Sequence, residues 1–67
     1  MEEVRDKIQK LLVIGDNRLK QGVSHEKVRE TYEEALALAR EHGLEDRIGP
    51  LVAVRLADLD RLAHDDG

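Results

Sequence analysis

The 67-residue sequence contains no cysteine, tryptophan or phenylalanine, and its only aromatic side chain is that of Tyr32. Without cysteine, the chain can form neither a disulfide framework nor a thiolate metal site. Without a cluster of aromatic rings, its small core has to be built from leucine, valine, isoleucine and alanine. A chain of this length forms at most one domain, so we expect a single domain over residues 1–67.

Long apolar segments are also missing. The longest uninterrupted apolar run, residues 11–14, is far too short to span a bilayer. The first residues are acidic, where a secretory signal peptide would need positive charge followed by an apolar stretch. We therefore expect a cytoplasmic protein that does not associate with membranes.

The charged residues are numerous but do not cluster by sign. The chain carries 15 acidic and 11 basic residues, mixed along its length, and a net charge of −4. Proteins that bind nucleic acids usually present a basic face, because much of their affinity comes from neutralising phosphates. The acidic balance therefore argues against a nucleic-acid partner.

Apolar residues recur at intervals of three and four along most of the chain, which is typical of amphipathic helices. Gly22 and Gly43 each follow such a segment and can end a helix, because glycine adopts the left-handed conformation at little cost. Ser24 is a suitable N-cap for the segment between them. We expect an all-α fold of three antiparallel helices, at about residues 3–21, 24–42 and 46–64, with a frayed tail at 65–67.

The third segment differs from the others in two ways. It contains Pro50, which lacks an amide hydrogen and is best accommodated in the first turn of a helix, so we expect the helix to start between Glu45 and Gly49 with Asp46 as its cap. It is also apolar around more than the one stripe that a three-helix domain requires. We expect the excess to mediate self-association through Leu51, Val52, Val54, Leu59 and Leu62.

Gly15 interrupts the first expected helix. A glycine inside a helix costs roughly 1 kcal/mol relative to alanine, so its presence needs a reason. Close packing is one such reason, and we expect the second helix to bring Val28 or Ala35 against the bare backbone of Gly15.

The stretch from Leu11 to Gly43 resembles one tetratricopeptide-type helical hairpin. Ile14-Gly15 stands where the family has Leu-Gly, Gly22 precedes the turn, and Tyr32 is followed three residues later by Ala35. The chain departs from the family pattern in the length of the turn and at Arg18, Val28 and Arg40. In length and in having a tyrosine in its second helix, the chain also resembles the three-helix domain of microtubule-interacting and trafficking proteins.

The tetratricopeptide resemblance implies that the first helix lines a concave groove for a partner protein. The matching positions are Gln9, Leu12, Val13, Asp16, Leu19 and Lys20. Family members that clamp a C-terminal carboxylate use Lys and Asn where this chain has Leu12 and Asp16, so a more apolar partner is expected. Burial of these residues in a core or a dimer is an equally good interpretation.

A single hairpin of this type cannot bury its apolar faces, and about three repeats are normally needed. Either the third helix caps the pair, or two chains stack to complete a core. The broad apolar surface of the third segment favours stacking, most simply as a two-fold homodimer.

No motif predicts catalysis, a cofactor or a metal site. The three histidines, His25, His42 and His64, are not spaced as metal ligands, and the carboxylates fall on exposed helical positions. We expect a non-enzymatic protein–protein interaction module, whose partner is another protein or a second copy. Two alternatives stay open: a small transcriptional regulator or nucleic-acid accessory protein, and an inhibitor or antitoxin-like protein that covers a partner's surface.

Overall fold

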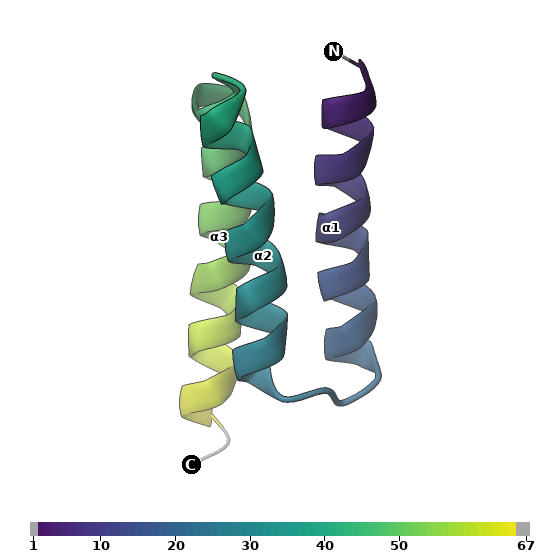
Figure 1. The fold of residues 1–67 in the computed structure, drawn as a ribbon. Coiled ribbons are helices and arrows are strands. Elements are labelled where there is room, and N and C mark those ends of the chain that lie inside the picture. Colours follow the sequence, from purple (N-terminus) through teal and green to yellow (C-terminus); the bar gives the residue numbers. More distant parts are fainter. Residues whose placement is uncertain (1, 66–67) are drawn as a thin grey trace.

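The structure, a computed structural model, describes residues 2–65 and contains three helices: α1 (Glu2–Lys20), α2 (His25–Glu41) and α3 (Glu45–Asp65). Consecutive helices run in opposite directions (Figure 1). The all-α fold is thus confirmed, and each helix boundary lies within one residue of its expected position. Of the expected frayed tail, Asp65 is the last residue of α3, and residues 66–67 lie outside the described residues. None of the helices within residues 2–65 is long and apolar enough to cross a membrane.

The first two helices end in the same way. Gly22 has φ +80° and Gly43 has φ +70°, both in the left-handed region that glycine adopts readily. After α1, the amide of Val23 donates to the carbonyl of Arg18 (3.0 Å), and after α2 the amide of Leu44 donates to that of Ala39 (2.8 Å). These bonds are those of a Schellman motif, which satisfies the last carbonyls of a helix and turns the chain sharply.

The start of α3 corrects the expected role of Pro50. The carbonyl of Leu44 accepts hydrogen bonds from the amides of Arg47 (3.0 Å) and Ile48 (2.9 Å), so the helix begins at Glu45, directly after the turn at Gly43. Asp46 therefore lies in the first turn rather than at the cap, and Pro50 lies inside the helix. Because proline has no amide hydrogen, the carbonyl of Asp46 lacks its usual helical donor.

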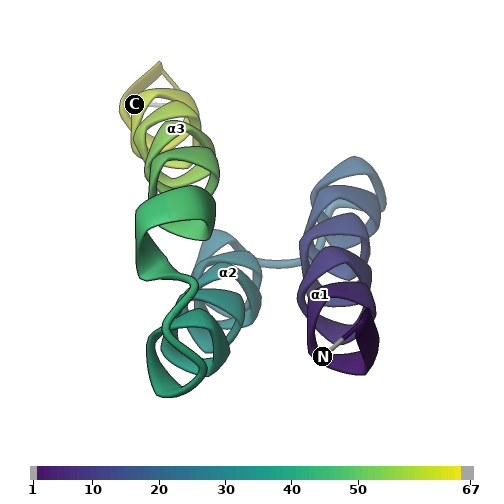
Figure 2. The same cartoon turned by 90° about the horizontal axis from the view of Figure 1, so that it is seen from above.

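Helix α2 lies between the other two. Both α1 and α3 pack along α2, whereas they make few contacts with each other. Seen from above, α1 and α3 lie along different sides of α2, and we call the region between them the corner (Figure 2). The molecule is therefore two helical hairpins that share α2.

The core is correspondingly centred on α2. Its buried apolar residues come from all three helices, with the largest share from α2: Ile8, Leu12, Val28, Tyr32, Ala35, Ala39, Val52 and Leu59. Ser24 occupies the N-cap position of α2, as expected, although its side chain forms no capping hydrogen bond.

Gly15 is a close-packing point, as expected, but its neighbour is Tyr32 rather than Val28 or Ala35. A methyl group placed on Gly15 would lie 2.5 Å from Cε1 and 2.9 Å from Cδ1 of the Tyr32 ring. The ring thus lies directly against the backbone of α1. The correction follows from size, because the aromatic side chain of Tyr32 extends further from α2 than valine or alanine does.

Candidate interaction surface

A polar cluster joins all three helices at the corner. The hydroxyl of Tyr32 in α2 donates a hydrogen bond to Oδ1 of Asp16 in α1 (2.5 Å). The guanidinium of Arg55 in α3 approaches the same carboxylate, with Nε 3.4 Å from Oδ1 and Nη2 3.4 Å from Oδ2. The short bond holds Asp16 on Tyr32, while the long contacts leave Arg55 only loosely bound.

The phenol of Tyr32 is almost completely buried, with 1% of the residue exposed. Burial, the hydrogen bond to Asp16 and the negative charge of that carboxylate together raise the pKa of Tyr32 from 10.0 to about 12, against a smaller opposite effect of Arg55. The hydroxyl therefore stays protonated at neutral pH and acts as a structural donor at the corner.

Further polar contacts connect neighbouring helices, among them those of Arg18 and Arg29. Arg18 of α1 donates to the hydroxyl of Thr31 (2.9 Å), which in turn donates to the carbonyl of Lys27 (3.0 Å), so the buried hydroxyl is satisfied. On the other side of α2, Arg29 forms an ion pair with Asp60 of α3. Both groups of that pair are about half exposed, so it orients α3 more than it stabilises the fold.

The expected groove residues of α1 fall in three different environments. Leu12 is buried in the core, and Asp16 and Leu19 are half-buried beside α2. Gln9, Val13 and Lys20 are exposed. Leu12 is therefore a core residue of the single chain. The groove residues that a partner could reach are the polar Gln9 and Lys20 and the apolar Val13.

Val13 belongs to a small apolar area on the outer side of α1. It is 55% exposed, its neighbour Ile14 is 40% exposed, and both border a shallow depression together with Asp6, Gln9 and Lys10. Charged and polar side chains thus surround the two apolar ones on this side.

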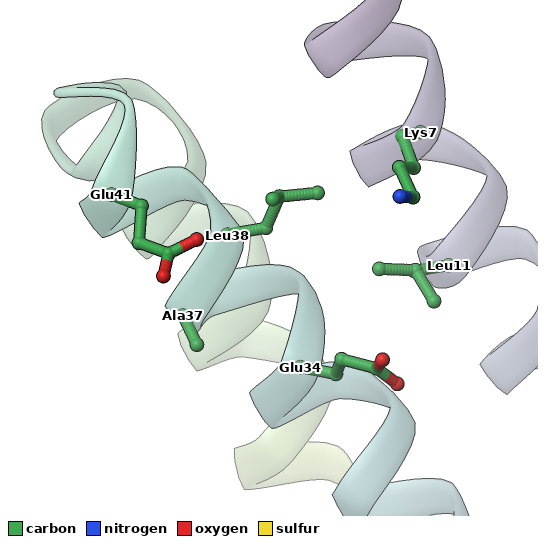
Figure 3. Close-up of a pocket in the computed structure, with 6 residues that line it drawn as sticks. All are labelled: Lys7, Leu11, Glu34, Ala37, Leu38 and Glu41. Atoms are coloured by element: carbon green, nitrogen blue, oxygen red, sulfur yellow. The ribbon is translucent and has the colours of Figure 1, made fainter.

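A second depression lies between α1 and α2. It is lined by Lys7 and Leu11 from α1 and by Glu34, Ala37, Leu38 and Glu41 from α2 (Figure 3). Leu11 and Leu38 point towards one another across it. Its volume of about 240 Å³ lies below the roughly 300–1,000 Å³ typical of small-molecule sites, so this depression is a seam between two helices.

The expected self-association residues of α3 divide into two faces. Val52 and Leu59 are buried against α2 and belong to the core of the single chain. Leu51, Val54 and Leu62 point outwards and are 48%, 61% and 44% exposed. The excess apolar surface on α3 therefore consists of these three outward residues.

No family model matches the chain, and no curated protein and no solved structure is significantly similar to it. The three-helix fold is compatible with a helical hairpin. Among the side chains that the structure describes, no three from histidine, cysteine, aspartate or glutamate lie close enough together to hold a metal ion.

Three polar residues with a defined place in the structure were absent from the sets expected from sequence. Arg55 reaches Asp16 across the corner, Asp58 is exposed on the same helix between Leu51 and Leu62, and Thr31 is buried. For Arg55 and Asp58 a signal was present, because they continue the helical spacing of the two leucines. The burial of Thr31 also had a signal, because Thr31 lies three residues after Val28 and four before Ala35, whereas its hydrogen bond with Arg18 depends on another helix.

Proposed function

We propose that this chain is a non-enzymatic protein–protein interaction module that binds a second copy of itself through the outer face of α3. The observation that carries the proposal is the exposure of Leu51, Val54 and Leu62 on a helix whose other face is already buried against α2. A helix that packs on one neighbour needs one apolar face, and α3 has a second.

The size of the chain supports the same proposal. A domain of 67 residues buries a small fraction of its surface, so its stability is marginal unless another chain supplies contacts. A second copy that covers the outer face of α3 removes apolar area from water. This burial stabilises the assembly by roughly 25 cal/mol for each Å² of apolar surface. Self-association therefore supplies buried apolar area that the single chain, with its two hairpins sharing α2, does not provide.

The resemblance to tetratricopeptide hairpins is a further support. Residues that carry the resemblance take part in the core, since Gly15 lies against the ring of Tyr32 and Ala35 is buried. We propose that α1 and α2 form one tetratricopeptide-like unit with α3 as the following helix. Because such units bury their faces by stacking, a single unit requires a neighbour.

The experiment that tests the proposal is the molar mass measured by light scattering over a hundredfold range of concentration. The native chain is expected to be a dimer at the upper end and to dissociate on dilution. Leu51→Glu places a charge on the outer face of α3 and is expected to give a monomer.

Val13→Glu is the matched control, because it places the same charge at an equally exposed apolar position on α1. It is expected to leave the dimer intact. Circular dichroism of each variant shows whether the helices are retained. A native chain that stays monomeric at every concentration, or a Leu51→Glu variant that dimerises as well as the native chain, would refute the proposal.

A further inference from the structure

The side of α3 that carries Leu51 and Leu62 has a pattern that is symmetric about its own centre. Leu51, Arg55, Asp58 and Leu62 follow one another at intervals of four, three and four residues. That spacing places them along one side of a helix, at the positions through which two helices pair in a coiled coil. Both leucines are nearly half exposed, Asp58 is exposed, and the Arg55 side chain is 33% exposed.

Read in the opposite direction, the pattern is Leu, Asp, Arg, Leu. The ends are identical, and the two central residues have opposite charges. A surface that binds its own copy across a two-fold axis must be complementary to itself, so that residue i meets j and j meets i. This pattern meets that condition when two α3 helices run antiparallel, with the axis passing between residues 56 and 57.

We infer that two copies of the chain pair antiparallel along α3, in the register that opposes Leu51 with Leu62 of the second copy and Arg55 with Asp58 of the second copy. This inference rests on the proposed self-association and adds its geometry. The two-fold axis repeats each contact, so the interface contains two leucine pairs and two ion pairs.

Charge excludes the competing arrangements. A parallel pair in register would oppose Arg55 with Arg55 and Asp58 with Asp58, which is repulsive at both layers. An antiparallel pair shifted by one heptad would oppose Leu51 with Arg55, and Ile48 with Asp58, leaving charges against apolar side chains. Of these three arrangements, the inferred register alone matches apolar with apolar and positive with negative, which gives specificity as well as affinity.

The contacts within one chain leave these groups available. Arg55 is held by Asp16 and by the carbonyl of Leu51 at 3.4 Å only, which is long for a charged hydrogen bond. Asp58 forms no ion pair with any residue of the described part of the chain. If Arg55 turns to a second copy, Asp16 keeps its short bond to Tyr32.

A charge-exchange experiment tests the register. Arg55→Asp opposes two aspartates at each of two symmetry-related layers, and Asp58→Arg opposes two arginines there. Each variant alone is expected to dimerise about a hundredfold more weakly than the native chain, taking a tenfold loss for each layer. An equimolar mixture of the two variants is expected to restore the dimer, because both layers of the heterodimer again pair opposite charges.

Asp46→Arg is the matched control for Asp58→Arg, since it makes the same charge change at an exposed position on the side of α3 that faces away from the pattern. It is expected to leave the dimer unchanged. Sedimentation equilibrium gives the dissociation constants, and circular dichroism shows that each variant is helical. Because Asp58→Arg does not touch Asp16, its result is independent of any effect of Arg55→Asp on the corner cluster.

Cysteine pairing provides a second readout, since the native chain has no cysteine. Leu51 and Leu62 of one helix are about 16 Å apart along its axis, at 1.5 Å per residue. In the inferred register Leu51 of one copy opposes Leu62 of the other, so the two Leu51 residues of the dimer are separated by the same distance, which is beyond the reach of a disulfide. Chains with Leu51→Cys alone are therefore expected not to cross-link with one another. Oxidation of a mixture of Leu51→Cys and Leu62→Cys chains is expected to give a disulfide-linked heterodimer.

The outcomes separate the two proposals. A native dimer whose charge variants still dimerise, or whose mixture fails to restore the dimer, overturns the register and leaves self-association standing. Disulfide formation between two Leu51→Cys chains also overturns the register, because it indicates a parallel pair. A native chain that is monomeric throughout overturns the proposed function itself.

Discussion

Replacing Gly15 with alanine changes two free-energy terms of opposite sign. Alanine is favoured over glycine in the interior of a helix by about 1 kcal/mol, so on a bare helix the substitution would stabilise α1. In this structure the new methyl carbon would lie 2.5 Å from Cε1, 2.9 Å from Cδ1 and 3.1 Å from Cζ of Tyr32. Ordinary carbon–carbon contacts begin near 3.5 Å, so α1 or the ring has to move.

The ring cannot move freely. It is buried, and its hydroxyl is held by Asp16 at 2.5 Å. Adding a methyl group to a packed interior costs about 1–3 kcal/mol, and a clash with three ring atoms belongs at the upper end of that range. Subtracting the gain in helix propensity, we expect Gly15→Ala to lower the free energy of unfolding by about 2 kcal/mol.

Gly49 supplies the matched control, because it is the other glycine inside a helix. Apart from its chain neighbours, a methyl group there would meet Cγ of Glu45 at 3.8 Å, which is an ordinary contact. The gain in helix propensity of about 1 kcal/mol is offset by the ring of Pro50, which disfavours the helical conformation of a preceding residue that carries a Cβ, so Gly49→Ala is expected to change the free energy of unfolding little. Thermal unfolding followed by circular dichroism, at one fixed protein concentration, should show a clearly lower Tm for Gly15→Ala and a nearly unchanged Tm for Gly49→Ala.

The double variant Gly15→Ala/Tyr32→Leu identifies the clash. With the ring removed, Gly15→Ala should cost less than it does in the native chain, because its unfavourable term comes from the ring. A Tm of Gly15→Ala that is no lower than the Tm of Gly49→Ala would refute the reasoning. So would an unchanged cost of Gly15→Ala in the Tyr32→Leu background.

Two other predictions concern α3 and the corner cluster. Pro50→Ala should raise the free energy of unfolding by about 2 kcal/mol, because it restores an amide donor to the carbonyl of Asp46. Urea titration measures this change, and the absence of a gain would mean that α3 tolerates the missing hydrogen bond. For Tyr32, the folded state holds the phenol pKa near 12, compared with 10.0 for an unperturbed tyrosine. The neutral phenol is thus favoured by folding, so its contribution to stability is complete below pH 10 and is lost as the pH rises towards 12. Since Tyr32 is the only tyrosine and there is no tryptophan, tyrosinate absorbance reports this titration directly. A midpoint at the unperturbed value, or the same alkaline loss of stability in Tyr32→Phe, would contradict the assignment.

The sequence was sufficient to predict the three helices, because their signals are local. Apolar spacing marks each amphipathic segment, and Gly22 and Gly43 stop α1 and α2 where a left-handed residue is needed. The need for close packing at Gly15 was also readable, since a helix tolerates glycine at a cost. These features depend on the residues within one or two turns, which the sequence contains in full.

The position of Pro50 within α3 could not be predicted from local residues. Proline favours the first turn, but the Schellman motif at Gly43 returns the chain so tightly that α3 begins at Glu45, a turn before Pro50. The preference of one residue for a helix start was outweighed by the geometry of the preceding helix end, together with the burial of Val52 and Leu59 against α2.

Tertiary structure alone decided which apolar residues are left for a partner. Apolar spacing placed Leu51, Val52, Val54, Leu59 and Leu62 on one helix but could not say which side faces α2. The side of α3 that faces α2 depends on where α1 and α3 pack on α2. At the corner between α1 and α3, side chains of Asp16, Tyr32 and Arg55 form contacts that connect the three helices. The sequence by itself determined the helices and their ends, because those arise from nearby residues. The fold determined the exposed face of α3, because burial is a property of elements that meet only after the chain has folded.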